Sequence, residues 1–284
     1  MTANRLKHIA PKISKNVNAK VLTFDVERIP GKARVQHRGL TIEGEFWALD
    51  GWKHTIGRRI NPDDVIEWPR TICAAGRWYG EKEVMFAAEW EEGGHEEFMR
   101  KVWHWYDECD ISVGHHILGF DEPHMRSSWA LYGWAPPSPW KTIDTLRVAR
   151  QAFGYESNTL DSLAKRLGIP AKTDKYDAKI AHAAVNGDKK AQKTLRKYNQ
   201  GDIVATEGLL NRLRPWLPGN VHLGQWTGSD TVCPNCGSEK VIPQVGKTIK
   251  ANVTAYQAYR CGDCGSNIRG NTKVDVSIKT RAAR

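Results

Sequence analysis

The sequence has little of what marks a membrane-spanning or secreted protein. None of its apolar runs approaches the ~20 residues that a helix needs to cross a bilayer, and no signal peptide precedes the first motif. Cysteine is scarce as well. Among the six in 284 residues, Cys73 and Cys109 stand alone in apolar surroundings that predict buried free thiols. These absences predict a reducing, cytoplasmic setting.

Also absent is any recognisable Ser-His-Asp or Cys-His arrangement, the usual machinery of covalent catalysis. Internal repeats and low-complexity runs are absent too. A chain of 284 residues can still bury a full core, and it has room for one large domain and one small one. An enzyme with this sequence is expected to work without a covalent intermediate.

What the sequence does have is acidic side chains in three short motifs, each set against an apolar run. The first, VLTFDVER, predicts a strand in which residues two apart share a face, so Asp25 and Glu27 project together. The second follows another apolar run and ends at Asp121, where a helix is expected to begin. In the third, Tyr198 and Asp202 lie one turn apart on a predicted helix.

These carboxylates predict a metal site. Burying several of them together is costly unless a cation lies among them, and Mg²⁺ or Mn²⁺ prefers such an all-oxygen set of ligands. Each motif alone is weak, because a single D-x-E in a strand is most often a solvated edge. The order of the three motifs predicts a two-metal nuclease site.

That order resembles the DEDD superfamily of 3′–5′ exonucleases, which has a ribonuclease H-like fold. The resemblance covers roughly residues 20–215 and is closest to the proofreading exonuclease domain of family B DNA polymerases, whose second motif has the form G-Y-N-I-x-x-F-D-x-P-Y. Residues 114–124 read GHHILGFDEPH here. The resemblance implies an α/β domain with a ribonuclease H-like mixed sheet flanked by helices.

The chain departs from the family's second motif at three histidines. His115 and His116 replace its Tyr and Asn, and His124 replaces its second Tyr. His116 is kept as a candidate contact to nucleic acid. The histidine branch of the superfamily needs His five residues before the last aspartate, but Lys197 stands there. The chain therefore resembles the tyrosine branch (DEDDy), with Tyr198 as its tyrosine.

The resemblance implies a catalytic set of five residues. Asp25, Glu27 and Asp202 would hold one Mg²⁺ or Mn²⁺, and Asp25 would bridge to a second that Asp121 supports. Two such cations stabilise the attacking and leaving oxygens of a phosphodiester displacement. Tyr198 would orient the attacking water. The product would be a nucleoside 5′-monophosphate.

A second strong pattern is a pair of Cys-x-x-Cys-Gly knuckles, CPNCG and CGDCG, with 24 residues between Cys236 and Cys261. This spacing predicts one structural Zn²⁺ in a zinc ribbon, and the glycines permit the tight turns. Disulfides are the alternative, which the reducing setting disfavours. A catalytic zinc is disfavoured because four thiolates leave no open position. The ligands would be Cys233, Cys236, Cys261 and Cys264.

The net charge of +10 is concentrated at the two ends of the chain. Residues 1–20 carry five basic side chains and no acid, and residues 231–284 carry nine basic against three acidic ones. Such flanks suit phosphate binding with a salt-dependent affinity. Tyr256 and Tyr259 could stack on bases or pack the core of the ribbon. The candidate contacts in the ribbon are Lys247, Lys250, Arg260 and Arg269.

Prolines and a glycine after Leu213 predict the end of the last large helix and a domain boundary. A further helix is expected over Leu160–Leu167, with Thr159 and Asp161 as candidate capping residues. Trp47–Arg59 resembles a hairpin. Most of the twelve tryptophans are expected to pack in the core or to cover the surface. One or two are candidates to line the channel that receives a frayed 3′ end. The predicted division is a basic tail 1–20, an exonuclease domain 21–218, a linker 219–230, a zinc ribbon 231–272 and a basic tail 273–284.

The leading hypothesis is a metal-dependent 3′–5′ exonuclease acting on single-stranded DNA or frayed 3′ ends. Its length and ribbon resemble stand-alone nucleases encoded by bacteriophages, which would place it in the host cytoplasm. An exoribonuclease is the first alternative, since the acids do not reveal contacts to the 2′-hydroxyl. A non-catalytic nucleic-acid adaptor using the ribbon is the second. Partner proteins are not indicated by the sequence.

Overall fold

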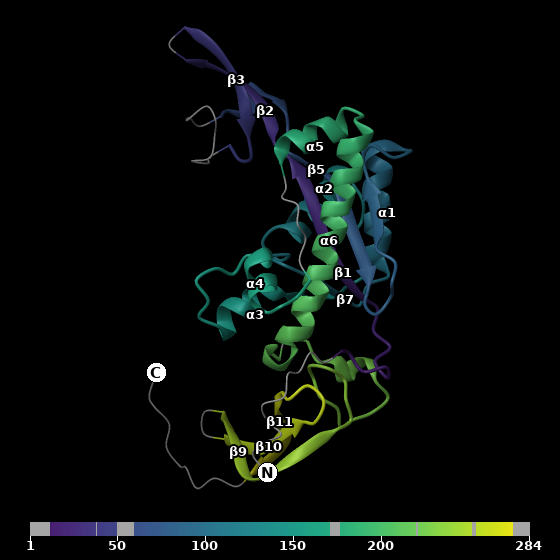
Figure 1. Ribbon diagram of the computed structural model, residues 1–284, viewed down its shortest axis with the longest axis vertical. Coiled ribbons are helices and arrows are strands. Elements are labelled where there is room, and N and C mark those ends of the chain that lie inside the picture. The colour runs from purple at the N-terminus through teal and green to yellow at the C-terminus, as the bar shows by residue number, and fades with distance from the viewer. Residues whose placement is uncertain are drawn as a thin grey trace.

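The computed structural model describes residues 12–37, 39–49, 60–170, 177–219, 221–251 and 254–274. Its centre is a five-stranded mixed sheet in the order β6-β5-β1-β7-β8 (Figure 1). Strand β1 runs antiparallel to β5 and parallel to β7, and β7 runs parallel to β8. The strands are β1 Val21–Ile29, β5 Arg70–Trp78, β6 Met85–Ala88, β7 Ile111–Gly114 and β8 Lys141–Asp144.

Helices cover both faces of this sheet, because the apolar residues of β1 alternate between them. Leu22, Phe24 and Val26 pack in one cluster with residues of α1 and α2, while Ile29 packs on the other face against α5 and α6. The helices are α1 Gly94–Asp107, α2 Asp121–Leu131, α3 Thr145–Ala152, α4 Leu160–Arg166, α5 Ala178–Val185 and α6 Lys189–Leu213. The expected α/β fold with a mixed sheet between helices is confirmed.

Several local expectations are confirmed as well. Helix α2 begins at Asp121, and Thr159 caps α4 by accepting a hydrogen bond from the Ser162 amide at 3.3 Å. Helix α6 ends at Leu213 and gives way to the short 3₁₀ turn η3, Arg214–Trp216. Cys73 and Cys109 are buried free thiols.

A small arm continues β1 beyond Ile29. It is a three-stranded sheet in the order β3-β2-β4, which projects at the top of Figure 1 away from the helices. Its own core contains Ala33, Val35, Phe46 and Ile60. The predicted hairpin over Trp47–Arg59 lies mostly outside the described residues. The elements of the arm are β2 Gly31–His37, β3 Leu40–Phe46, the 3₁₀ turn η2 Pro62–Asp64 and β4 Val65–Glu67.

The C-terminal unit is a three-stranded antiparallel sheet in the order β11-β10-β9, seen below α6 in Figure 1. Its core is formed by the four cysteines of the knuckles with Ile268. The 3₁₀ turn η4, Leu223–Trp226, precedes it. None of the described helices is long and apolar enough to cross a membrane. The strands are β9 Val241–Ala251, β10 Thr254–Cys261 and β11 Asn267–Val274.

The described parts of the predicted tail and of the predicted linker contact the rest of the chain. Ile13 and Val17, from the predicted basic tail, pack against a cluster that includes Val21 and Ile111. Leu223, from the predicted linker, is buried in the same cluster. The Ser14 amide also donates to the backbone oxygen of Cys236 at 2.7 Å. The chain before β1 therefore contacts both the large sheet and the ribbon.

Candidate active site

The site is built around three carboxylates from two elements. Asp25 and Glu27 project from the same face of β1, as residues two apart in a strand do. Asp202 reaches them from α6, which packs across that face. One oxygen from each carboxylate lies within 4.8 Å of the others. The structure therefore brings together three carboxylates from segments that are far apart in the sequence, close enough to share one cation.

Burial raises the electrostatic cost of keeping these three carboxylates ionised. Glu27 is 8% exposed and Asp202 is 6% exposed, while Asp25 is half-buried. Three carboxylates this close repel one another in a medium less polar than water, and a divalent cation with oxygen ligands relieves that repulsion. The donor set therefore fits Mg²⁺ or Mn²⁺.

Asn199 holds Asp25 and was missed at the sequence level. Its side-chain amide nitrogen donates to Asp25 Oδ2 at 2.6 Å, and the side chain is fully buried. Asn199 lies three residues before Asp202 on α6, so both face the same side of the helix. That spacing was the available signal, but a single asparagine in a helix is too common to single out.

Asp121 contacts the backbone of β1. Its Oδ1 accepts a hydrogen bond from the Val26 amide at 3.1 Å, at the residue between Asp25 and Glu27. Burial raises the pKa of Asp121 to about 7, and the neighbouring carboxylates of Asp144 and Glu122 add to the shift. Asp121 is not among the three carboxylates whose oxygens lie within 4.8 Å of one another. It is placed beside the cluster, at the first residue of α2.

Tyr198 lies on α6 one turn before Asp202 and is half-buried. Residues four apart on a helix share a face, so its side chain leaves the helix on the side that carries Asp202. Lys197, at the position where the other branch of the superfamily has histidine, is exposed. The prediction that Tyr198 and Asp202 lie one turn apart on the same helix is confirmed.

Two other buried carboxylates support the framework. Asp144 caps α3 by accepting from the Leu146 amide at 2.9 Å, and it also accepts from the amides of His116 and Leu118 in the loop before α2. Glu122 accepts from Ser112, Thr142, Trp140 and Arg126. Both are saturated by donors, so the exclusion of Asp144 from the predicted metal ligands agrees with its contacts.

The loop that carries His115 and His116 is held in one conformation. His116 has φ 72°, a left-handed conformation that is uncommon outside glycine. The ring of His115 bonds to the Thr145 hydroxyl at 3.0 Å and to the Asn158 carbonyl at 2.9 Å. His115 therefore ties the loop to α3 and to the chain before α4. The ring of His116 lies over Gly119, where a Cβ would meet it at 2.6 Å.

The four knuckle cysteines converge as the sequence predicts for a tetrahedral site. All four are buried and form the second possible metal-holding group. The sulfurs of Cys233 and Cys264 are 3.5 Å apart, and those of Cys236 and Cys261 are 3.6 Å apart. Zinc–sulfur bonds of about 2.3 Å separate the sulfurs of a tetrahedron by roughly 3.8 Å. The cluster therefore fits a structural Zn²⁺, and the cysteines are free rather than disulfide-bonded.

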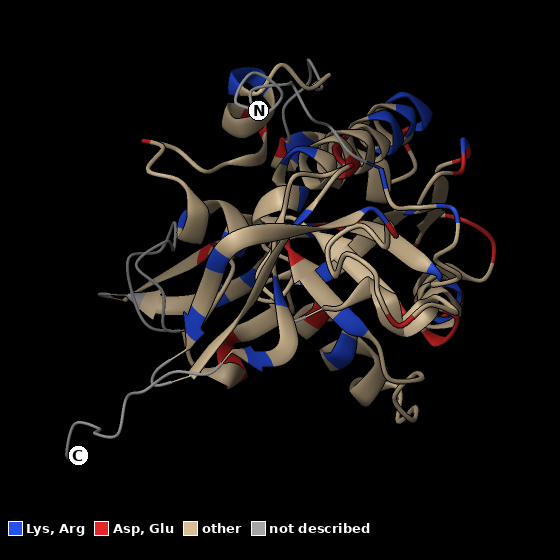
Figure 2. Ribbon diagram, turned by 90° about the horizontal axis from the view of Figure 1, so that it is seen from below, with Lys and Arg blue, Asp and Glu red and all other residues tan. Residues whose placement is uncertain are grey.

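The predicted basic contacts lie on the ribbon sheet, away from the carboxylates. Lys247 and Lys250 are exposed on β9. Arg269 lies over the ring of Tyr256 at 4.7 Å, and Arg260 bonds to Asn267. Figure 2 looks at this end of the molecule, where blue segments recur along the strands. Tyr259 packs against the cysteine cluster, which favours a packing role for it over base stacking.

Comparison with known proteins matches one family model and finds similarity to other proteins. The family model described as the RNase_H superfamily matches residues 69–214, a range that includes Asp121, Tyr198 and Asp202 but begins after β1. Protein NEN2 of Arabidopsis thaliana is 38% identical over 65 residues, which are 22% of this chain and 13% of that protein. The family B DNA polymerase of the archaeon Pyrobaculum calidifontis aligns at 15% identity with a TM-score of 0.49, over 84% of this chain and 32% of that one.

Proposed function

We propose that this chain, which belongs to the RNase H superfamily, is a metal-dependent 3′–5′ exonuclease that acts on single-stranded DNA or frayed 3′ ends. One observation carries the proposal. Asp25 and Glu27 of β1 and Asp202 of α6 place their oxygens within 4.8 Å of one another, in a donor set that fits Mg²⁺ or Mn²⁺.

Asp25, Glu27 and Asp202 would hold the first cation, and Asp121 would help Asp25 to hold a second. When bound, two such cations stabilise the attacking and leaving oxygens of an in-line phosphodiester displacement. The protein keeps the ligands in place through neighbours that are themselves buried. Asn199 fixes one oxygen of Asp25, and the Val26 amide fixes one oxygen of Asp121.

Tyr198 is proposed to orient the attacking water. Its hydroxyl can hydrogen-bond a water molecule on the side of α6 that carries Asp202, and so aim the water at the terminal phosphorus. Attack breaks the bond from phosphorus to the 3′-oxygen of the preceding nucleotide, and that oxygen takes up a proton as it leaves. The products are a nucleoside 5′-monophosphate and a strand one nucleotide shorter. With these roles, the chain would belong to the tyrosine branch.

The ribbon and the segment before β1 supply the basic surface that a nuclease with an acidic centre needs. Lys247 and Lys250 face solvent, where they can pair with phosphates and contribute salt-dependent affinity. The ribbon itself would be held by one Zn²⁺ on the four cysteines. Nucleic-acid contact by these lysines, by Arg260, by Arg269 and by His116 is part of the proposal.

The test is product identification. Wild-type protein and Asp25→Ala are incubated with single-stranded DNA and RNA of the same sequence, with and without Mg²⁺, and the products are identified by mass spectrometry. The exposed acid Asp63 provides a matched control, Asp63→Ala. We expect 5′-mononucleotides from wild type and from Asp63→Ala only, and only with the metal. Faster release from RNA would favour the exoribonuclease, and binding without products would favour the adaptor.

A further inference from the structure

The three strands of the C-terminal unit carry basic side chains and no acidic ones. Five lysines and arginines occur in β9, β10 and β11, and neither aspartate nor glutamate occurs there. The acids of this unit lie at its knuckles instead. Glu239 is exposed just before β9, and Asp263 accepts hydrogen bonds from Ser238 and Lys240. The sheet itself therefore has an excess of positive charge.

Pairing between the strands places three of these basic side chains on one face of the sheet. Residues directly opposite each other in an antiparallel pair share a face, as do residues two apart in one strand. Tyr256 lies opposite Lys273, and Ala258 lies opposite Arg269. Arg260 follows Ala258 by two residues. The register shifts between Tyr256 and Ala258, but the Arg269 guanidinium lies 4.7 Å from the Tyr256 ring, so both side chains are on the same face.

The other face of the sheet is turned toward the cysteines. Ile268 is buried in the cysteine cluster, and Tyr259 packs against it. The face with Tyr256, Arg260, Arg269 and Lys273 is therefore the outer face of the sheet. Arg269 and Lys273 are exposed there, and Arg260 is half-buried. Figure 2 looks at this end of the molecule, where blue segments mark basic residues on the strands.

The contacts of these basic groups leave their charge uncompensated. Within the residues that the structure describes, no carboxylate pairs with Arg260, Arg269 or Lys273. Arg260 donates to the side-chain oxygen of Asn267 at 3.4 Å, and Arg269 is stacked on Tyr256. Both contacts orient a guanidinium without neutralising it. An oriented guanidinium presents its N–H groups as a fork that matches two oxygens of a phosphate.

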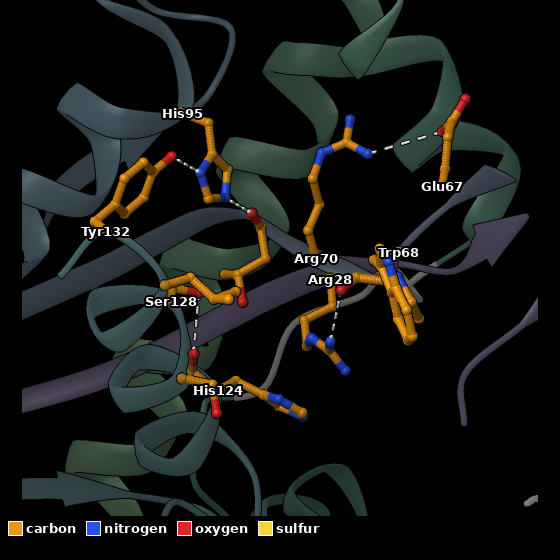
Figure 3. A pocket seen from close by; sticks show the side chains of 12 residues that line it. Arg28, Glu67, Trp68, Arg70, His95, His124, Ser128 and Tyr132 are labelled. Atoms are coloured by element: carbon orange, nitrogen blue, oxygen red, sulfur yellow. Dashed lines mark hydrogen bonds and ion pairs between the residues drawn. The ribbon is translucent and has the colours of Figure 1, made fainter. Parts of the chain in front are cut away.

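The pocket at the end of β1, shown in Figure 3, differs in this respect. Its volume is about 490 Å³, and Arg28, Trp68 and Arg70 line it together with the acid Glu67. Arg70 is bonded to Glu89 through two contacts of 2.9 Å and lies 3.9 Å from Glu67. Acidic side chains therefore compensate positive charge in that pocket, whereas the strands of the outer face contain none.

The side chains of the outer face suit phosphates better than unstacked bases. Tyr256 and Tyr259 are the aromatic residues of the three strands. Arg269 already covers the Tyr256 ring, and Tyr259 packs on the cysteine side. A single strand therefore gains little stacking energy here. Duplex DNA carries one phosphate charge per about 1.7 Å of its axis and keeps its bases paired, so it fits this face better.

We propose that the outer face binds the phosphate backbone of double-stranded DNA. The inference rests on the proposed function, which includes Arg260 and Arg269 among the contacts to nucleic acid. It adds Lys273 to them and names the part of the substrate that they hold, the duplex behind a frayed 3′ end. The carboxylate cluster is not part of this face, so binding needs no free 3′ end. Contacts to phosphates alone also carry no sequence preference.

The test uses DNA without a 3′ end. A short duplex is closed by a loop at each end, and its affinity is measured by fluorescence anisotropy at several salt concentrations without added Mg²⁺. Arg269→Gln and a triple variant that combines it with Arg260→Gln and Lys273→Gln are compared with wild type. Lys240→Gln is the matched control for a single charge, because Lys240 belongs to the same unit but is paired with Asp263 at 2.9 Å. Thermal melting of every variant reports on folding.

We expect wild type to bind two closed duplexes of unrelated sequence with similar Kd. Arg269→Gln should lower the slope of log Kd against log salt concentration by about 0.9, the contribution of one phosphate contact, and the triple variant should lower it about three times as much. Arg269→Lys should keep the slope, because the charge remains, and Lys240→Gln should match wild type. Equal Kd and equal slope in wild type and a folded triple variant overturn the inference. Tighter binding of a single-stranded circle than of the closed duplex overturns the assignment to duplex.

The result also separates this inference from the proposed function, which cleavage of linear single-stranded DNA by wild type reports. If wild type cuts that DNA with Mg²⁺ but the triple variant binds the closed duplex like wild type, only the outer-face assignment fails. If wild type cuts no nucleic acid but loses its affinity for the closed duplex in the triple variant, the exonuclease proposal fails and the outer face stands. If wild type neither cuts nor binds, both fail.

Discussion

Arg214, directly after α6, donates a hydrogen bond from its Nη1 to the backbone oxygen of Asn235, 3.0 Å away inside the first cysteine knuckle. Its Nη2 donates to Asn211 Oδ1, and the guanidinium lies over the ring of Tyr79. The side chain is fully buried. The Arg214 guanidinium therefore joins the unit that contains the cysteine knuckles to the end of the helix that carries Asp202.

These contacts of Arg214 predict that Arg214→Met destabilises the whole protein. The substitution leaves the Asn235 carbonyl without its donor, and an unsatisfied buried group costs about 1–3 kcal/mol. Chemical denaturation should show a fall of that size in the free energy of unfolding. Arg212→Met, two residues earlier on α6 and partly exposed, is the control and should be nearly neutral. An unchanged unfolding midpoint in Arg214→Met would refute the coupling.

Removal of zinc should have a related effect. The knuckle that Arg214 contacts depends on thiolates that a bound Zn²⁺ would hold together. A zinc chelator should therefore lower the melting temperature of the large domain as well as unfold the ribbon. Hydrogen exchange at the C-terminal end of α6 measures this directly. Exchange there that is identical with and without the chelator would show that the two units are independent.

Loss of the contact between Asn199 and Asp25 should weaken metal binding. Partners that orient a metal ligand typically contribute about 10–100-fold in affinity or activity, so Asn199→Ala should raise the Mg²⁺ concentration for half-maximal activity by about tenfold or more. Gln200→Ala is the control, because Gln200 bonds to the Val84 carbonyl on another side of α6. A metal requirement equal to that of wild type would mean that Asn199 only packs.

Tyr198→Phe should lower the turnover rate by about 10²-fold, the lower end of what acid–base and water-orienting groups contribute. Metal affinity should be unchanged, because the four carboxylates remain. Comparison of kcat with the Mg²⁺ dependence separates the two effects. A variant with full kcat would remove Tyr198 from the proposed mechanism.

His95 predicts a pH dependence of stability. The Thr71 carbonyl can only accept, so Nε2 carries the proton and Nδ1 accepts from Tyr132. Burial lowers the pKa of His95 below its ordinary value. The unfolded chain takes up the proton first, at about pH 6.5, so the stability conferred by neutral His95 is present above that pH and is lost as the pH falls below it. Denaturation of His95→Gln should lack this part of the acid sensitivity.

The sequence could predict the parts of the site that depend on short-range order. The two-residue period of a strand placed Asp25 and Glu27 on one face, and the four-residue spacing placed Tyr198 with Asp202. The knuckle spacing likewise predicted the cysteine cluster. In each case a local pattern determines which way the side chains point.

The parts of the fold and of the site that the sequence did not predict depend on contacts between segments far apart in the chain. Trp68 gains its place beside Arg28 because β4 pairs with β2, where Lys32 lies opposite Glu67. Arg214 meets Asn235 only after the ribbon has docked against α6. Neither relationship leaves a periodic trace in the sequence, and the same is true of Ser14, which bonds to Cys236 over more than two hundred residues.

The most direct test of the central claim is a time course of cleavage of single-stranded DNA labelled at its 5′ end, in Mg²⁺, with wild type and Asp202→Ala. The proposed site predicts a ladder that shortens one nucleotide at a time from the 3′ end in wild type, and intact strands that still bind to a folded Asp202→Ala. Full cleavage by Asp202→Ala, or immediate release of the labelled 5′ nucleotide by wild type, would contradict it.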